Sequence, residues 1–498
     1  MALTHHRNNP NMKSNHKLIF SFLSGPILAL IVGILCFNSN IEGMTDKVAW
    51  TAVITTLTAV WWMLEPIPIP AVSLIPFVLF PVFGILSHKV AAAQLGNHLI
   101  ILFMGGFMLS VAMEKSGTHR RIAYGVLKIV GTNSRKRILL GFMLATAFLS
   151  MWISNTATTL MMMPIAMAVL AQDQDETMAV PLLLAICYAA SIGGVATVIG
   201  TPPNGVFIEN YQALTGIEMS FTEWMSIGGI MSLIMLPIAW IWLGRGVSSS
   251  SSKQIHLPTI SDWTKAQKRV LIVFVITALL WITRAIPLGT WQIGEDAVLI
   301  KGWGGLMEHY LGIATIGDST VAILAVLALF IIPDGEKYED GKPRGLLDWK
   351  HASQIPWGIL LLFAGGLLIA KGFVESGLTQ VLGNQLVLLA DLPLWLIIGV
   401  ICLTVTFLTE ITSNTATANV LLPILGGASL SLNLENPLIL MVPATISASF
   451  AFMLPVATPP NAIVMSSGKI PVRAMAREGL FLNLMGAFVI TLVCYFIL

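Results

Sequence analysis

The tripeptide Ser-Asn-Thr occurs twice in an otherwise apolar chain, beginning at Ser154 and at Ser413. Hydroxyl and amide oxygens are ligands for hard cations, whereas hydroxyl and amide hydrogens donate to carboxylates. Ser150 lies four residues before the first tripeptide and Thr409 four residues before the second. At helical spacing, each adds a second hydroxyl to the same helix face. The two motifs are therefore suited to hold small cations beside a carboxylate anion.

A Thr-Pro-Pro-Asn motif follows each tripeptide, at Thr201 and at Thr458. Proline lacks an N–H group and breaks a helix, so backbone carbonyls near Gly200 and Ala457 are expected to be free to complete two cation sites. No Lys or Arg lies inside either motif. A bound anion would then be neutralised mainly by cations and helix ends, which makes its binding depend on the coupling ion. This dependence is a physical route to symport.

The two sets of motifs belong to an internal duplication. A distance of 259 residues separates Ser154 from Ser413 and also Pro164 from Pro423, and 257 residues separate the two Thr-Pro-Pro-Asn motifs. Doubled, polar segments interrupted by proline in an apolar chain indicate the binding site of a transporter.

The composition is that of a membrane protein. Hydrophobic residues make up 56% of the chain and charged residues 10%, against about 25% charged residues in soluble domains. The net charge of +2 gives no reason to expect a nucleic-acid partner. The four cysteines lack metal-type spacing, and no disulfide framework is expected. The apolar run 18–37 is interpreted as a retained first span instead of a signal peptide.

The expected fold is an all-α polytopic membrane protein with about eleven transmembrane helices and two re-entrant hairpins. A crossing needs about 20 apolar residues. The hairpins are expected at 138–171 and 394–430, where each apolar block has a tripeptide at its middle. The expected crossings are 18–37, 48–65, 68–86, 97–116, 178–215, 222–244, 269–286, 318–333, 355–375, 437–466 and 479–498.

The basic residues set the expected orientation. Most of the 27 Lys and Arg residues fall in alternate loops, and the positive-inside rule then places the N-terminus in the cytoplasm and the C-terminus outside. With this parity the two hairpins enter from opposite sides, so the halves form an inverted repeat. Inverted repeats that meet near the bilayer midplane are typical of secondary transporters.

Four segments carry a resemblance to a known family. They are SNTAT at Ser154, FLTEITSNTATA ending at Ala418, GTPPN at Gly200 and ATPPN at Ala457. With them the chain resembles the divalent anion:sodium symporter family, the INDY-type dicarboxylate and citrate transporters, over nearly all of its length after the N-terminal tail. The stretch 287–317 matches less recognisably.

The resemblance implies two sodium sites and one substrate site. The residues implied for the first sodium site are Ser150, Ser154, Asn155 and the backbone near Gly200, and those for the second are Thr409, Ser413, Asn414 and the backbone near Ala457. The residues implied for the substrate are Asn155, Thr156, Thr201, Asn414, Thr415 and Thr458, with Pro202 and Pro459 lining the pocket.

The resemblance also implies a homodimer that works as an elevator. Scaffold helices would occupy 18–137 and 245–393, after a disordered cytoplasmic tail at 1–17. The sliding transport domain would consist of 138–244, with the broken helix 178–215, and of 394–498, with the broken helix 437–466 and the last helix.

The expected function is sodium-coupled symport of C4 dicarboxylates, such as succinate, malate and fumarate, across the plasma (inner) membrane. The alternative is a sodium-independent exchanger of dicarboxylates or citrate. A membrane-embedded serine hydrolase would need a base near Ser154 or Ser413, and no His or Lys lies in either hairpin core, so an enzyme is not expected. Two roles stay open for Glu410, proton binding and an interhelical hydrogen bond, and the hydrogen bond is favoured.

Overall fold

The computed structural model describes residues 10–172, 176–247, 262–293, 296–313, 316–339, 341–386, 392–432, 434 and 436–498. The first helix, α1 (Pro10–Phe37), begins ahead of the expected span 18–37. Residues 1–9 of the expected tail lie outside the described residues. Of the stretch 287–317, the described parts form a small hairpin and a helix, whereas 294–295 and 314–315 also lie outside.

In the described part of the first half of the chain, all regular secondary structure is helical. One expected span, 68–86, consists of two short helices, because prolines begin each of them and interrupt the hydrogen bonding between them. The helices are α2 (Asp46–Leu64), α3 (Ile69–Val72), α4 (Ile75–Val82), α5 (His88–Ala93), η1 (Gln94–Gly96), α6 (His98–Ser116), α7 (Thr118–Val130), α8 (Arg135–Ser150), α9 (Asn155–Leu170), η2 (Glu176–Met178), α10 (Ala179–Gly194), α11 (Pro202–Thr215) and α12 (Phe221–Gly244).

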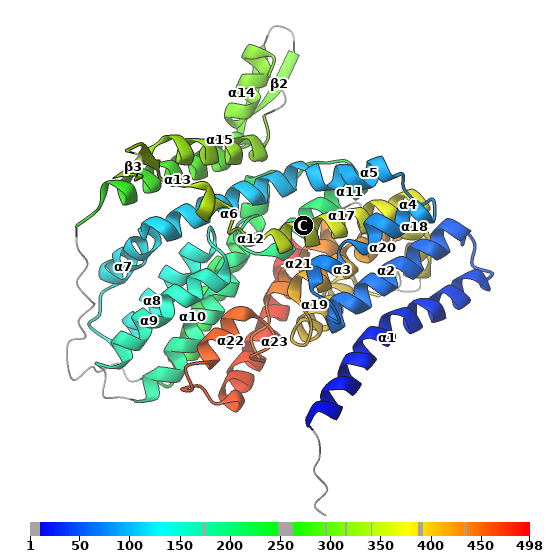
Figure 1. Cartoon of the computed structure of the whole chain (residues 1–498), viewed down its shortest axis with the longest axis horizontal. Coiled ribbons are helices and arrows are strands. Elements are labelled where there is room, and N and C mark those ends of the chain that lie inside the picture. The colour runs from blue at the N-terminus through cyan, green and yellow to red at the C-terminus, as the bar shows by residue number, and fades with distance from the viewer. Residues whose placement is uncertain are drawn as a thin grey trace, which may run out of the picture.

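The second half adds two small antiparallel hairpins, so the all-α expectation is corrected to a mostly helical fold. The hairpin β1–β2, with the helix that follows it, projects from the helical body (Figure 1). The elements are α13 (Lys265–Arg284), β1 (Pro287–Ile293), β2 (Asp296–Lys301), α14 (Gly302–Leu311), α15 (Asp318–Ile331), β3 (Pro333–Lys337), β4 (Pro343–Gly345), α16 (Trp349–Ala352), α17 (Trp357–Ser376), α18 (Leu378–Leu386), α19 (Leu394–Thr409), α20 (Asn414–Ser431), α21 (Leu438–Ser449), α22 (Pro459–Met465) and α23 (Val472–Ile497).

Seven helices in the described part of the chain are long and apolar enough to cross a membrane. They include α1, α2, α12, α13, α17 and α23, together with the continuous stretch His88–Ser116. A further six apolar helices of 10–17 residues are shorter. The protein is therefore a multi-pass membrane protein.

The two blocks expected to be hairpins are each a pair of helices joined by four residues. Residues 151–154 join α8 to α9, and residues 410–413 join α19 to α20. Both expected helix breaks are also present: residues 195–201 separate α10 from α11, and residues 450–458 separate α21 from α22. In each half, Ser-Asn-Thr stands at the joint of a helix pair and Thr-Pro-Pro-Asn at the end of a break.

Helix α10 packs closely against α8 and α9. This packing places the joint at residues 151–154 beside the break at residues 195–201. The side chains of α10 from Leu182 to Ile192 are all buried. A Cβ added at Gly193 would overlap the backbone of Ala147, and one added at Gly194 would lie 2.6 Å from Asn155 Oδ1. Only glycine permits this packing of α10 against α8 and α9.

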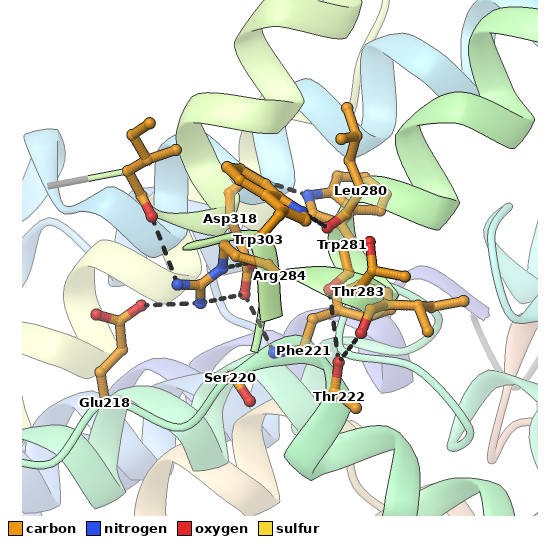
Figure 2. Close-up of polar contacts among 12 residues, drawn as sticks. Glu218, Ser220, Phe221, Thr222, Leu280, Trp281, Thr283, Arg284, Trp303 and Asp318 are labelled. Carbon is orange, nitrogen blue, oxygen red and sulfur yellow. Dashed lines mark hydrogen bonds and ion pairs between the residues drawn. The ribbon is translucent and has the colours of Figure 1, made fainter. Parts of the chain in front are cut away.

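A polar junction fixes the start of α12 against α13 and α15 (Figure 2). Asp318 Oδ2 accepts a hydrogen bond from the backbone N–H of Phe221, at the first residue of α12, over 3.1 Å. Arg284 donates to both carboxylate oxygens of Asp318, from Nε at 2.5 Å and from Nη2 at 3.1 Å. Trp281 Nε1 donates to the Asp318 carbonyl, and Glu218 lies 3.6 Å from Arg284. One carboxylate thus connects three helices.

Candidate substrate and cation site

Residues from both halves of the chain line one cavity of about 600 Å³. Both Ser-Asn-Thr joints and both Thr-Pro-Pro-Asn breaks line it, and Phe103, Phe107, Ile69 and Ile359 add apolar wall. Of the fourteen residues expected from the sequence, twelve line this one cavity: Ser154, Asn155, Thr156, Gly200, Thr201, Pro202, Ser413, Asn414, Thr415, Ala457, Thr458 and Pro459. The other two, Ser150 and Thr409, are fully buried behind it.

Four helices begin at the wall of this cavity. Their first residues are Asn155 of α9, Pro202 of α11, Asn414 of α20 and Pro459 of α22, and all four line it. Helices α9, α11 and α20 have 14 to 18 residues, whereas α22 has 7. The N-terminal end of a helix carries a partial positive charge, which favours an anion. Free N–H groups can be supplied only by α9 and α20, because α11 and α22 each begin with two prolines. The cavity is thus suited to an anion, although no basic side chain of the described residues lies on its wall.

The first group of oxygens surrounds Asn155. Its inner amide atom lies 2.6 Å from Ser150 Oγ, 3.1 Å from the carbonyl oxygen of Ala190 and 3.3 Å from that of Gly200. With the amide nitrogen in this place, Asn155 donates to all three groups. The hydroxyl group of Ser150 and the carbonyls of Ala190 and Gly200 thus gather around the Asn155 side chain, and oxygens of these kinds are ligands for a hard cation.

The second group is similar and consists of a hydroxyl group, an amide oxygen and one backbone carbonyl. Thr409 Oγ1 donates to Asn414 Oδ1 over 2.7 Å and to the carbonyl oxygen of Ala448 over 3.0 Å. Ala448 thus has the place beside Thr409 and Asn414 that Ala190 has in the first half. The two carbonyls were missed in the sequence analysis, because a backbone oxygen leaves no mark in the side-chain pattern.

The asparagine of each Thr-Pro-Pro-Asn motif stabilises the conformation of a helix break through hydrogen bonds to backbone carbonyls. Asn204 Nδ2 donates to the carbonyl of Thr197 over 2.7 Å, and also to those of Gly194 and Val195. Asn461 Nδ2 donates to the carbonyls of Ala451 and Leu454, each over 3.0 Å. These bonds satisfy carbonyls that the broken helices leave unpaired. The motif marked both positions, but the sequence analysis gave neither side chain a role.

In each half, the helix break donates hydrogen bonds to the joint of the neighbouring helix pair. Thr197 Oγ1 donates to the Met151 carbonyl in the first half. In the second half Glu410 takes the place of Met151, and its carboxylate accepts from the backbone N–H groups of Met453 and Leu454, each over 2.9 Å. Asn483 of α23 donates to the same carboxylate over 2.7 Å. The hydrogen bond expected for Glu410 is therefore present.

Glu65 is a wall residue that the sequence analysis did not single out. It is the one charged side chain on the cavity wall in the described part of the chain. It also has a positive φ of 47°, which no other non-glycine residue has among those the structure describes. Its backbone N–H closes the end of α2 by bonding to the Trp61 carbonyl over 3.0 Å. A strained backbone at a charged wall residue is a common mark of function, and the run EPIPIP was its signal in the sequence.

A helical membrane protein with paired broken helices around one polar cavity belongs to the class of membrane transporters. The family model described as "Sodium:sulfate symporter transmembrane region" matches residues 21–497, so the chain belongs to this family. The resemblance drawn from the motifs is confirmed.

Curated relatives match the whole chain. The "Sodium-dependent dicarboxylate transporter SdcS" of Staphylococcus saprophyticus is 40% identical over 97% of this chain and 93% of the relative. The protein of the same name from Staphylococcus aureus is 39% identical over 98% of this chain and 93% of the relative. Among solved structures, the YdaH transporter of Alcanivorax borkumensis matches with a TM-score of 0.56 and 12% identity, covering 82% of this chain and 87% of that one. At this identity the likeness concerns the fold alone.

Proposed function

We propose that this protein is a secondary active transporter that imports C4 dicarboxylates such as succinate, malate and fumarate with sodium. The observation that carries the proposal is the pairing of two similar oxygen groups with four helix beginnings around one cavity, on whose wall the described residues place no basic side chain. A dianion in such a cavity is stabilised mainly by helix ends and by cations bound beside it. Relatives named as sodium-dependent dicarboxylate transporters support this reading.

The residue roles are proposed on the same grounds. The first sodium ion is bound by Ser150, Ser154, Asn155 and the Gly200 carbonyl, and the second by Thr409, Ser413, Asn414 and the Ala457 backbone. To these the geometry adds the carbonyls of Ala190 and Ala448. The substrate carboxylates meet Asn155, Thr156, Thr201, Asn414, Thr415 and Thr458 beside Pro202 and Pro459.

The helix pairs α8–α9 and α19–α20 are proposed to be re-entrant. A helix of 16 residues is about 24 Å long, which is less than the roughly 30 Å of the hydrocarbon core. Their polar joints then lie inside the membrane, facing the cavity instead of lipid. About eleven crossings, an inverted repeat with a cytoplasmic N-terminus, and a homodimer with sliding transport domains complete the proposal.

The sodium-independent exchanger is not favoured, because the relatives carry sodium dependence in their names. A serine hydrolase is not favoured either. In the described part of the chain the cavity wall contains no His, Lys or Asp that could activate Ser154 or Ser413, and no hydrogen bond joins either serine to Glu65, the one carboxylate on the wall.

The test is uptake of labelled succinate into proteoliposomes. Uptake is expected to collapse when external sodium is replaced by potassium or choline, and to be lost in Asn155→Ala and in Asn414→Ala. The matched control is Asn384→Ala on the exposed face of α18, which should transport normally. Sodium-independent uptake that requires succinate inside the vesicle would point to the exchanger, and normal rates in either cavity variant would contradict the site.

A further inference from the structure

Five acidic side chains are buried in the described part of the chain, and four of them have clear partners. Those four either pair with an arginine or accept backbone and amide N–H groups. Their interactions are Asp318 with Arg284, Asp334 with Arg344, Glu478 with Arg245, and Glu410 with Met453, Leu454 and Asn483. The fifth is Glu209, and it differs from all of them.

Glu209 lies in α11, about two turns beyond Pro202 at the cavity wall. Its side chain is 2% exposed. Both carboxyl oxygens are buried, and neither has a hydrogen-bond partner among the residues that the structure describes. No counter-residue exists in the second half of the duplication, where Ser466 occupies the matching position. The residue is therefore not part of the duplicated cation machinery.

Among the described residues around α11, no charged side chain is bonded to the carboxyl group of Glu209. Helix α11 packs mainly against α17, α20 and α21, and its Gly205 touches Phe103 of α6. Helices α20 and α21 contain no titratable residue. On the other elements the titratable residues are Tyr211 of α11, the pair Lys371 and Glu375 of α17, and His98, Glu114 and Lys115 of α6. Lys371 bonds to Glu375, and Lys115 to Asp348, so neither lysine is paired with Glu209.

An ionised carboxylate without partner in an apolar interior is far costlier than the neutral acid, which the group becomes by taking up a proton. An ionisable residue buried in a membrane domain is also, by default, a candidate functional site. We propose that Glu209 is a proton-binding site, at which the carboxyl group carries a proton in the conformation described here.

The position of Glu209 connects this proton to movement. Helix α11 begins at the cavity and packs against α17, which belongs to the scaffold if the proposed division into sliding domains holds. Separation of α11 from α17 would bring water to the carboxyl group and release its proton. Proton affinity then differs between two conformations, so external pH biases their equilibrium. This last step rests on the proposed function, whereas the proton site itself does not.

The first experiment detects the proton without any transport. Infrared spectra of the full-length protein in nanodiscs at neutral pH should show the C=O stretching band of a buried carboxylic acid. The band should be lost in Glu209→Gln and kept in Glu410→Gln, because Glu410 accepts three N–H groups and Glu209 accepts none among the described residues. A wild-type spectrum without the band, or a band unchanged in Glu209→Gln, would overturn the proposal.

The second experiment covers the case in which the spectra are obscured by other groups. Keeping the proton becomes costlier as pH rises, so the melting temperature of the wild type should fall between mildly acidic and alkaline pH relative to that of Glu209→Gln. The difference between the two proteins should widen steadily with pH. A constant difference would contradict proton binding at Glu209. Failure of succinate uptake in both proteins would instead count against the proposed function and leave the melting-temperature result intact.

Discussion

Replacement of Thr409 by valine tests the proposed second cation site most directly. Valine has nearly the shape of threonine but lacks the hydroxyl group that donates to Asn414 Oδ1 over 2.7 Å and to the Ala448 carbonyl over 3.0 Å. A hydrogen-bonding group that acts on a charge contributes about 1.5–3 kcal/mol, and each 1.4 kcal/mol is a factor of ten in affinity. The half-saturating sodium concentration for succinate uptake should therefore rise about ten- to a hundredfold.

The chain offers a matched control for this change. Thr406, one turn earlier in α19, is also fully buried, but its hydroxyl group has no hydrogen-bond partner among the described residues. Thr406→Val should leave the sodium dependence unchanged. Thr409→Ser keeps the hydroxyl group and should have the sodium dependence of the wild type. The measurement is a sodium titration of initial uptake rates in proteoliposomes with equal amounts of inserted protein. Equal shifts in the two valine variants, or a rate lowered by the same factor at every sodium concentration, would refute the reasoning.

Two further changes test parts of the structure outside the duplicated motifs. Glu65→Gln removes the one charge on the described cavity wall and should raise the half-saturating sodium concentration a few-fold, as expected for an exposed charge worth up to about 1 kcal/mol. A sodium titration at low ionic strength would show it, and an unchanged curve would deny Glu65 any role in attracting cations. Asp318→Asn leaves the guanidinium of Arg284 without its bidentate partner and should destabilise the protein by about 3–5 kcal/mol, seen as a lower melting temperature. A melting temperature equal to that of the wild type would show that the junction contributes little.

Side-chain patterns predicted the parts of the fold that depend on apolar length and on proline. The helix pairs around Ser154 and Ser413 and the breaks before Pro202 and Pro459 are where the motifs placed them. Long apolar runs such as α12 and α23 were also found, because the lipid requires continuous apolar helices. The span 68–86 was wrong in detail, since its length pointed to one helix but its prolines divide it.

The candidate site was predicted only as far as side chains define it. Twelve expected residues line one cavity because two duplicated motifs had to meet there. The carbonyls of Ala190 and Ala448 were invisible, since every residue has a carbonyl and only the fold selects which ones face inward. Glu65 was missed for another reason: its place on the wall depends on how the first half folds over the second.

The absence of a basic side chain from the described wall of the cavity has a consequence for evolution and for engineering. A lysine placed at Thr156 or Thr415 would give the dianion a permanent counter-charge. The protein would then bind the substrate with or without sodium. It could therefore change conformation with only one of the two bound. Such a variant would move sodium or substrate alone, and the sodium gradient would be dissipated without accumulation of the substrate. In the proposed transporter, strict coupling of substrate to sodium therefore depends on the absence of a basic side chain from the described wall.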